Sequence, residues 1–351
     1  MRNPILFLIF VLLFANCQKE INIKQSIDNL FAEFTDAAPG ASITVVKSGE
    51  VLYQKGFGLA NLDSQTKIEP KTNFRLASIT KQFTALSILL LEEENKLSLN
   101  DPLHKFFPEF PSYGTEITIK NILQHTAGFP AYEDHLPDTL SIQLKDKDVL
   151  EILMKQDSTF FPPGTMHRYS NSGYAVLALI IEKVSGKSFA EFLHDRIFTP
   201  LGMNNSVAFE KGISEINNRA FGYAKTDSGF VFADQSLTSA VLGDGGIYSS
   251  VIDLIKWNSS FENATLLRKE SINRIFEKTI LQNGEIADYG LGWRLDPYNN
   301  HIRHYHTGGT SGFSNIYMKL PQLELIIIIL INIRDYDAKS YAEKIADLFI
   351  E

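Results

Sequence analysis

The sequence predicts an α+β fold in which an antiparallel sheet flanked by helices is assembled from both ends of the chain. Three observations lead to this prediction. A hairpin pattern occupies residues 41–59, strand patterns return between 289 and 333, and the part between, from about 78 to 240, is mainly helical. Because strands come from both ends of the chain, the helical part is predicted to be an insertion into the sheet domain.

The first residues carry the pattern of a bacterial lipoprotein signal. Met1-Arg2 is a short positive start, residues 4–15 are an almost unbroken apolar run, and Cys17, the only cysteine, follows. The run is too short to span a bilayer, which takes about 20 residues, and fits the apolar region of a signal peptide. We predict a signal peptide over 1–16, lipidation of Cys17 and a tether over 17–25. An ordinary secretory signal with an incidental cysteine is the alternative.

Both alternatives place the mature protein outside the cytoplasm, and the lipidated form in the periplasm or at the outer membrane, held to the membrane through Cys17. A net charge of −8 and a pI near 5.6 leave no basic stripe and argue against a nucleic-acid partner. A single cysteine excludes an intramolecular disulfide. With 44% hydrophobic and 21% charged residues, the composition is that of a folded soluble protein.

Hydrophobic periodicity and turn residues define the elements of the first half. An amphipathic helix is predicted over 23–34, followed by the hairpin around the Lys47-Ser48-Gly49-Glu50 turn. The helical insertion begins at Ser78. Its further helices are predicted from apolar spacing, N-cap residues and stops at glycine or proline, at 118–124, 146–154, 174–184 and 188–197.

The last third returns to strands after a capped helix that starts at Ser250. Leu325–Ile331 is wholly apolar but only about half as long as a membrane span, so it is predicted to be a central strand buried on both faces. A closing amphipathic helix is predicted over 337–349. The other strands are predicted at 289–293, 302–306 and 313–320. The domain boundaries follow: 26–77 and 244–351 for the sheet domain, and 78–243 for the helical domain.

Ser78 and Lys81 form the first candidate catalytic pair. They are three residues apart at the start of a helical pattern, so their side chains share one face of the helix. A serine hydroxyl is a weak nucleophile and needs a neighbouring base, which a lysine can supply. The spacing alone is weak evidence, because a helix cap followed by a surface lysine has the same pattern.

Two further motifs lie where a common site could use them. Tyr169-Ser170-Asn171 precedes a predicted helix, and His306-Thr307-Gly308-Gly309 ends a predicted strand. With Ser-x-x-Lys, these motifs resemble those of the serine β-lactamase and penicillin-binding-protein superfamily, specifically its class C-like branch. The resemblance covers roughly residues 25–350 and implies a β-lactamase/transpeptidase-like fold with the active site between the two domains.

The resemblance assigns a role to each motif. Ser78 is the nucleophile that forms an acyl-enzyme, and Lys81 and Tyr169 together remove its proton. Asn171 is expected to hydrogen-bond Lys81 and the substrate, and the backbone N–H groups of Ser78 and Gly309 are expected to form the oxyanion hole. Gly308 and Gly309 are expected to leave room for a substrate along the strand edge, beside Thr307. The alternatives from the residues alone are a core tyrosine at 169 and a helix cap at 171.

His306 departs from the family pattern, because penicillin-recognising relatives carry lysine at this position. A neutral imidazole is a poorer anchor for a substrate carboxylate than an ammonium group, so efficient β-lactamase activity is not expected, although slow acylation by penicillin is compatible with the motifs. A zinc site formed by His301, His304 and His306 is the rival interpretation. Strand alternation separates the first histidine from the other two, and we predict no metal and no cofactor.

The sequence thus predicts a lipid-anchored serine hydrolase that acts on an amide, an ester or a D-amino-acid peptide, with a small molecule or peptide as substrate. The alternative from a different functional class is a non-catalytic, penicillin-binding-like surface lipoprotein that binds a peptide or a cell-wall ligand.

Overall fold

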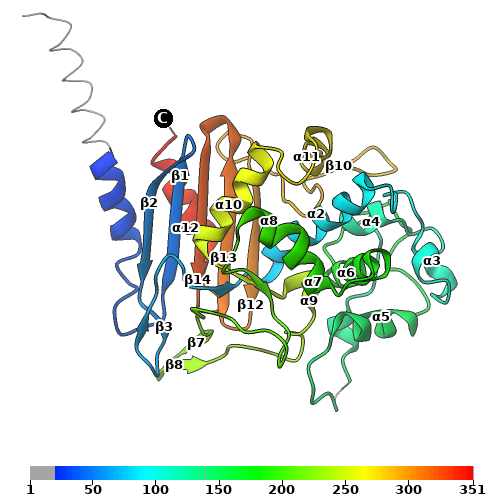
Figure 1. The fold of residues 1–351 in the computed structure, drawn as a ribbon, viewed down its shortest axis with the longest axis horizontal. Helices are drawn as coiled ribbons and strands as arrows, with labels where there is room; N and C mark the ends of the chain where they lie inside the picture. Colours follow the sequence, from blue (N-terminus) through cyan, green and yellow to red (C-terminus); the bar gives the residue numbers. More distant parts are fainter. Residues whose placement is uncertain (1–19, 138, 351) are drawn as a thin grey trace, which may run out of the picture.

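A five-stranded antiparallel sheet forms one half of the molecule (Figure 1). The computed structural model describes residues 20–137 and 139–350. The strand order is β12-β13-β14-β1-β2, so strands from the two ends of the chain are neighbours. The strands are β1 (Ala41–Lys47), β2 (Glu50–Phe57), β12 (His304–Thr310), β13 (Phe313–Leu320) and β14 (Leu325–Ile331). The predicted α+β class and the sheet built from both ends are confirmed.

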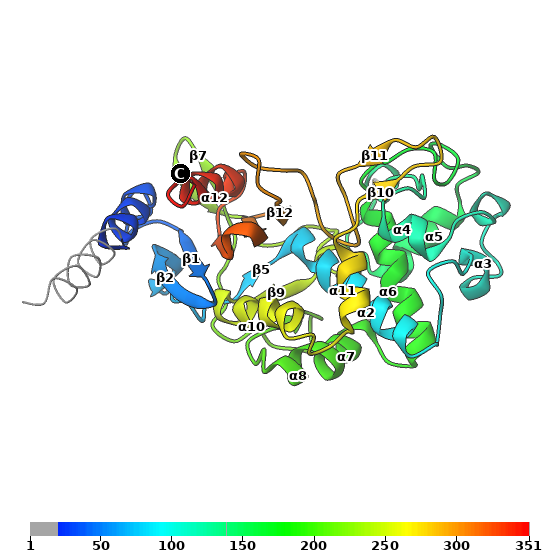
Figure 2. The same cartoon turned by 90° about the horizontal axis from the view of Figure 1, so that it is seen from above.

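Strand β14 is the third of the five strands, and all its residues are buried. Ile327 and Ile329 belong to one hydrophobic core, whereas Ile326 and Ile328 belong to the other, on the opposite face. The predicted central strand is therefore correct. One face is covered by α12 (Ala338–Asp347) and the helix of residues 20–30, and the other by α10 (Val251–Glu262), as Figure 2 shows for α12 and α10.

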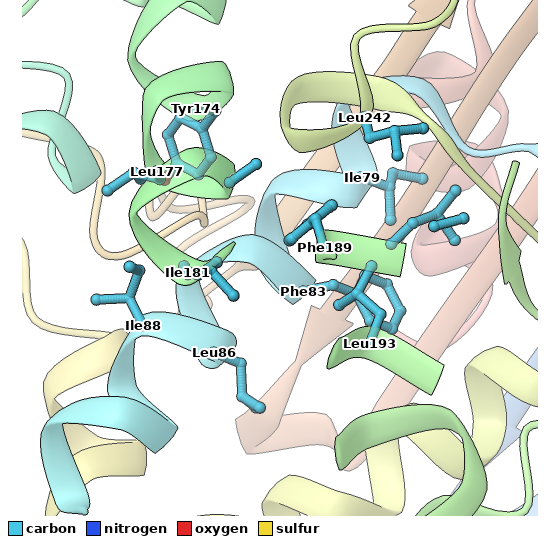
Figure 3. Packing of buried hydrophobic residues seen from close by; sticks show 14 of the residues in the cluster. Ile79, Phe83, Leu86, Ile88, Tyr174, Leu177, Ile181, Phe189, Leu193 and Leu242 are labelled. Atoms are coloured by element: carbon cyan, nitrogen blue, oxygen red, sulfur yellow. The ribbon is translucent and has the colours of Figure 1, made fainter. Parts of the chain in front are cut away.

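The second half of the molecule is helical and surrounds α2 (Thr80–Glu93). Figure 3 shows side chains of α2 packed between those of α6 (Asn171–Ser185) and α7 (Phe189–Leu193). Residues 80–91 of α2 are all buried, so this helix is enclosed on every side and not only along the predicted apolar stripe.

The remaining elements are short. The other helices are α3 (Leu103–Phe106), α4 (Ile119–Leu123), α5 (Asp146–Met154), α8 (Thr199–Leu201), α9 (Leu242–Gly245) and α11 (Lys269–Ile275), with a π-helical turn at His194–Phe198. The 3₁₀ turns are η1 (Ala77–Ile79), η2 (Ser112–Gly114), η3 (Tyr132–His135) and η5 (Pro321–Leu323). The small sheets pair β3 (Leu59–Asn61) with β4 (Thr66–Lys67), β7 (Tyr223–Thr226) with β8 (Gly229–Phe232), β10 (Thr279–Ile280) with β11 (Ile286–Ala287), and β5 (Phe74–Arg75) and β6 (Val207–Ala208) with β9 (Ile247–Ser249).

Two predicted element boundaries differ from the structure. The first helix starts by residue 20 and buries Ile23, so residues 20–25 of the predicted tether belong to a helix packed on the sheet. The predicted strand at 289–293 is instead an irregular buried segment. The cause is Gly292, whose φ of 80° is incompatible with a strand and lets the segment approach the backbone of Lys81.

The predicted signal peptide of residues 1–16 and the lipidation site at Cys17 lie outside the described residues. Within the described ranges, no helix combines the length and apolar character needed to cross a bilayer.

Candidate active site

Ser78 lies in the turn η1, between strand β5 and the start of α2 at Thr80. Helix α2 therefore begins two residues later than predicted, and Ser78 precedes its first turn. Ala77 has a φ of 50°, a conformation that costs a non-glycine residue on the order of 1–3 kcal/mol and is concentrated at functional sites. The left-handed residue changes the chain direction just before Ser78, whose side chain lines a cleft.

Lys81 is completely buried, and its amino group is held at three contacts. It donates to the Asn171 side-chain oxygen and to the Asp244 carbonyl, both at 2.8 Å, and lies 3.3 Å from Ser78 Oγ. The first two oxygens can only accept hydrogen bonds, so they use two hydrogens of the amine. The remaining position faces Ser78, which places the amine where the hydroxyl proton must leave during attack.

Asn171 orients this lysine. Its Nδ2 donates to Glu133 Oε1 at 2.7 Å, which fixes the amide with its oxygen toward Lys81. The capping role considered for Asn171 is taken by Ser170, whose hydroxyl accepts the Gly173 N–H of α6. The position of Asn171 at the start of α6 therefore serves the contact with the lysine.

Tyr169 lies beside the same lysine, with Lys81 Nζ 5.0 Å from its ring centroid. His125 holds this segment on both sides of the tyrosine: its carbonyl accepts the Arg168 N–H at 2.9 Å, and its Nδ1 accepts the Ser170 N–H at 3.1 Å. The Tyr169 hydroxyl is buried and has no hydrogen-bond partner among the described residues. Buried polar groups are normally paired, so this hydroxyl is available to a reacting group.

The backbone of Gly309 also lies at the cleft beside Ser78. Residues 304–310 are all in β12, so the glycines lie within the strand and not at its end as predicted. The N–H and C=O of Tyr305 pair with Arg294, on the side away from β13. Because these directions alternate along an antiparallel edge strand, the N–H of Gly309 also points to the open edge. Gly309 and Ser78 line one cleft, as an oxyanion hole requires.

His306 is engaged within the protein, which corrects its predicted contact with substrate. Its Nδ1 lies 2.7 Å from the Thr307 carbonyl and must donate, so Nε2 accepts from the Tyr289 hydroxyl at 3.1 Å. Burial, together with the charges of Lys81 and Arg294, lowers the pKa of His306 to about 3. The imidazole is therefore neutral at pH 7, with both ring nitrogens used.

The three histidines of the zinc alternative do not converge. His304 stacks on Phe276 with ring centroids 4.2 Å apart, and His301 Nδ1 contacts the Asn299 carbonyl at 2.8 Å. Within the described part of the chain, no group of three or more metal-binding side chains is present.

The buried imidazole of His306 should make the protein less stable in acid. An unfolded chain protonates this histidine below pH 6.5, but the folded protein does so only near pH 3, so the free energy of unfolding falls as the pH drops between these values. Between pH 7 and pH 5, His306 alone should cost about 2 kcal/mol. We expect urea unfolding of His306→Gln to depend on pH correspondingly less than the wild type.

Tyr289→Phe provides the control, because it removes the hydroxyl that contacts Nε2 but leaves the imidazole of His306 in place. This variant should keep most of the pH dependence of the wild type. Equal pH dependence in His306→Gln and the wild type would contradict a buried neutral imidazole at position 306.

A small polar cleft of about 190 Å³ lies directly beside Ser78, and we call it the serine cleft. Its lining includes Arg75, Glu133, Asn171, Asp244 and Gly309. Burial raises the pKa of Asp244 to about 6, although Lys81 opposes this shift. Sequence reasoning missed Arg75, Glu133, Asp244 and Arg294 as site residues, because no motif spacing marks them.

The predicted site residues fall into two groups. The first group lies around the Ser78 hydroxyl and consists of Ser78, Lys81, Tyr169, Asn171 and Gly309. Thr307 lines an adjoining hollow of about 440 Å³ along the outer part of β12, with Arg334 and Lys339, and Gly309 and Thr310 line both this hollow and the serine cleft. The buried Gly308 packs against the Leu76 carbonyl, so its lack of a side chain serves chain packing and not the predicted approach of substrate.

Comparisons with known proteins agree with this arrangement. A family model described as "Beta-lactamase" matches residues 27–349. Penicillin-binding protein 4* of Bacillus subtilis is 32% identical over 308 residues, which cover 83% of this chain and 67% of that protein. The octameric penicillin-binding protein homologue of Pyrococcus abyssi superposes with a TM-score of 0.79 at 30% identity, over 94% of this chain and 77% of its own. The penicillin-binding protein of Bacillus halodurans gives 0.80 at 25% identity, over 92% and 98%.

The family model covers more than nine-tenths of the chain, and the matched structures share both the sheet and the helical part. The predicted superfamily and fold class are therefore confirmed, and the chain belongs to the β-lactamase family of serine hydrolases.

Proposed function

We propose that this protein hydrolyses an amide, an ester or a D-amino-acid peptide through an acyl-enzyme on Ser78. The observation that carries the proposal is the position of Lys81 Nζ, 3.3 Å from Ser78 Oγ and held there by Asn171 and the Asp244 carbonyl. A buried lysine aimed at a serine has no comparable use in a protein that only binds a ligand.

The reaction follows from these contacts. The Ser78 hydroxyl loses its proton to the Lys81–Tyr169 pair as Oγ bonds to the substrate carbonyl carbon. The N–H groups of Ser78 and Gly309 stabilise the negative charge on the carbonyl oxygen, a contribution of roughly 3 kcal/mol for each donor. Tyr169 returns the proton to the leaving group as its bond to carbon breaks. Water then attacks the acyl-enzyme, gives a proton to the same pair, and releases the acid and the Ser78 hydroxyl.

The serine cleft favours short acyl groups. At about 190 Å³ and lined mainly by polar side chains, it has room for a small polar acyl group and offers little apolar surface to a long acyl chain. The engaged His306 offers no ammonium group to a penicillin carboxylate. Short aminoacyl or acetyl compounds are therefore better reporter substrates than penicillins, and p-nitrophenyl acetate is the simplest of them.

A fluorophosphonate probe tests the proposal directly. We expect it to modify the wild-type protein on Ser78, to block release of p-nitrophenol from p-nitrophenyl acetate, and to leave Ser78→Ala unlabelled. Mass spectrometry of the labelled peptide identifies the serine. The variant Ser311→Ala, in the turn between β12 and β13, is the control and should be labelled like the wild type.

Two results would overturn the proposal. Absence of both labelling and hydrolysis in the folded wild-type protein would instead favour a non-catalytic lipoprotein that binds a peptide or cell-wall ligand. Labelling that persists in Ser78→Ala would place the nucleophile at another residue.

A further inference from the structure

Asp146, the first residue of α5, is a buried acid without a cation beside it. The residue is 8% exposed, and within residues 20–137 and 139–350 no lysine or arginine forms an ion pair with it. Its two carboxyl oxygens accept backbone N–H groups of α9 instead, Oδ2 from Leu242 and Oδ1 from Gly243, both at 2.9 Å. Because buried acids are normally paired with a cation, an acid bound to the backbone of a distant segment requires an explanation.

Helix α9 depends on this acid. The first N–H groups of a helix have no partner within it, and Leu242 and Gly243 are both buried. A buried N–H group without a partner is costly. With four residues, α9 is also too short to be stable by itself. Asp146 therefore fixes where α9 begins.

The carbonyl groups of α9 contact α2, the helix that carries Lys81. Thr84 Oγ1 donates to the Gly243 carbonyl at 2.7 Å, and Lys81 Nζ donates to the Asp244 carbonyl at 2.8 Å. The Asp244 carbonyl is one of the two oxygens that hold the Lys81 amine 3.3 Å from Ser78 Oγ. The position of this amine therefore depends on where α9 lies.

Asp146 does not reach the reacting groups itself. Asp244 and Gly245 of α9 line the serine cleft, whereas Asp146 and Leu242 line a different cavity, of about 720 Å³. Helix α9 thus contributes to the walls of both cavities, and a substrate in the serine cleft would not contact Asp146. Any effect of this acid on the reaction must pass through α9.

We propose that Asp146 is a positioning residue for the reaction at Ser78. By binding the first two N–H groups of α9, it holds the Asp244 carbonyl against Lys81, and so holds the Lys81 amine at the Ser78 hydroxyl. The inference rests on the function proposed above. Because a small displacement of a catalytic group costs much of the rate, loss of this anchor should slow acylation without weakening substrate binding.

The variant Asp146→Asn tests this role. The amide keeps the size of the side chain, and its oxygen accepts one N–H group, but its NH₂ group then faces the other N–H group as a second donor. With p-nitrophenyl acetate we expect the acylation rate constant to fall about tenfold and KM to change by less than about twofold. Burial raises the pKa of Asp146 to about 7, although its two backbone hydrogen bonds oppose this shift, so the measurements are made at pH 8.

The control is Asp148→Asn, which removes an acid of the same charge from the same helix. Asp148 Oδ2 accepts the Lys145 N–H at 2.7 Å and so caps α5 itself, without a contact to α9. This variant should acylate at nearly the wild-type rate, which separates loss of the α9 anchor from a change in charge or fraying of α5.

A double-mutant cycle shows whether Asp146 acts through the lysine. In the Lys81→Met background no amine remains for α9 to hold, so Asp146→Asn should produce no further loss of acylation.

Two readouts need no substrate. Hydrogen–deuterium exchange of residues 240–247 should be faster in Asp146→Asn and unchanged in Asp148→Asn. A crystal structure of Asp146→Asn should show the Asp244 carbonyl moved away from Lys81 Nζ, and Lys81 Nζ moved away from Ser78 Oγ. If these changes occur but the wild-type protein is not acylated, the proposed function fails while the positioning of Lys81 by Asp146 is supported.

Three results would overturn the inference: Lys81 and the Asp244 carbonyl unmoved in Asp146→Asn, an equal loss of acylation in Asp148→Asn, or a full further loss in the Lys81→Met background. If Asp146→Asn does not fold, Asp146→Ser takes its place in every measurement, because its hydroxyl still accepts one N–H group and adds no second donor that must face the other.

Discussion

Replacing Lys81 by methionine is expected to lower the rate of Ser78 acylation by at least about a hundredfold, the usual scale for the loss of a general base. Methionine fills a similar volume but cannot accept the hydroxyl proton, and it leaves the oxygens of Asn171 and Asp244 without their donor. Stopped-flow release of p-nitrophenol from p-nitrophenyl acetate measures the acylation step, and circular dichroism checks that the variant is folded.

Lys256 offers a matched control. Its amino group also bonds to a backbone carbonyl, that of Gly202, and to a buried acid, Asp253, but it is on α10. Lys256→Met therefore removes similar contacts outside the site and should acylate at nearly the wild-type rate. A folded Lys81→Met that acylates within about threefold of the wild type would exclude Lys81 as the proton acceptor.

Gly308→Ala is expected to destabilise the protein by about 3 kcal/mol and to lower acylation about a hundredfold. A Cβ at this position would lie 2.0 Å from the Leu76 carbonyl oxygen, two residues before Ser78. Both sides of this contact are backbone, so β12 and the Ser78 segment would have to move apart. Urea unfolding measures the loss of stability, and single-turnover kinetics measures the loss of alignment.

Gly309→Ala is the matched variant, one residue along the same strand. A Cβ there meets no atom within 4 Å, and its φ lies outside the left-handed range. Its unfolding free energy should change by no more than about 0.5 kcal/mol. Equal stability of Gly308→Ala and Gly309→Ala would show that β12 is not seated against Leu76.

Local sequence patterns predicted the structure correctly where it depends on residues that are close together along the chain. The prediction of α5 at 146–154 matches the structure, and Thr118 and Ser250 cap their helices as expected. The Ser78–Lys81 contact also follows from sequence spacing, although Ser78 lies in a 3₁₀ turn and not in the helix. Short sequence separations keep such groups close whatever surrounds them.

Local sequence patterns gave wrong predictions where the structure depends on contacts with a segment that is distant in sequence. The segment 289–293 has the composition of a strand, but Gly292 packs it against the backbone of Lys81. Gly308 and Gly309 are indistinguishable by sequence, yet one is packed on Leu76 and the other lies on the cleft. The motif position of His306 predicts a substrate anchor, but the Tyr289 hydroxyl occupies its second nitrogen.

The sequence by itself determined the fold class, the central strand β14 and the motifs that surround Ser78, because apolar periodicity, caps and short spacings are properties of neighbouring residues. Only the tertiary structure decided which charges act on those motifs. Arg294, Glu133 and Asp244 reach the site from three separate segments. The lowered pKa of His306 results from its burial by residues of several other elements. Electrostatic effects depend on distance and solvent exclusion in space, and neither can be read from positions along a chain.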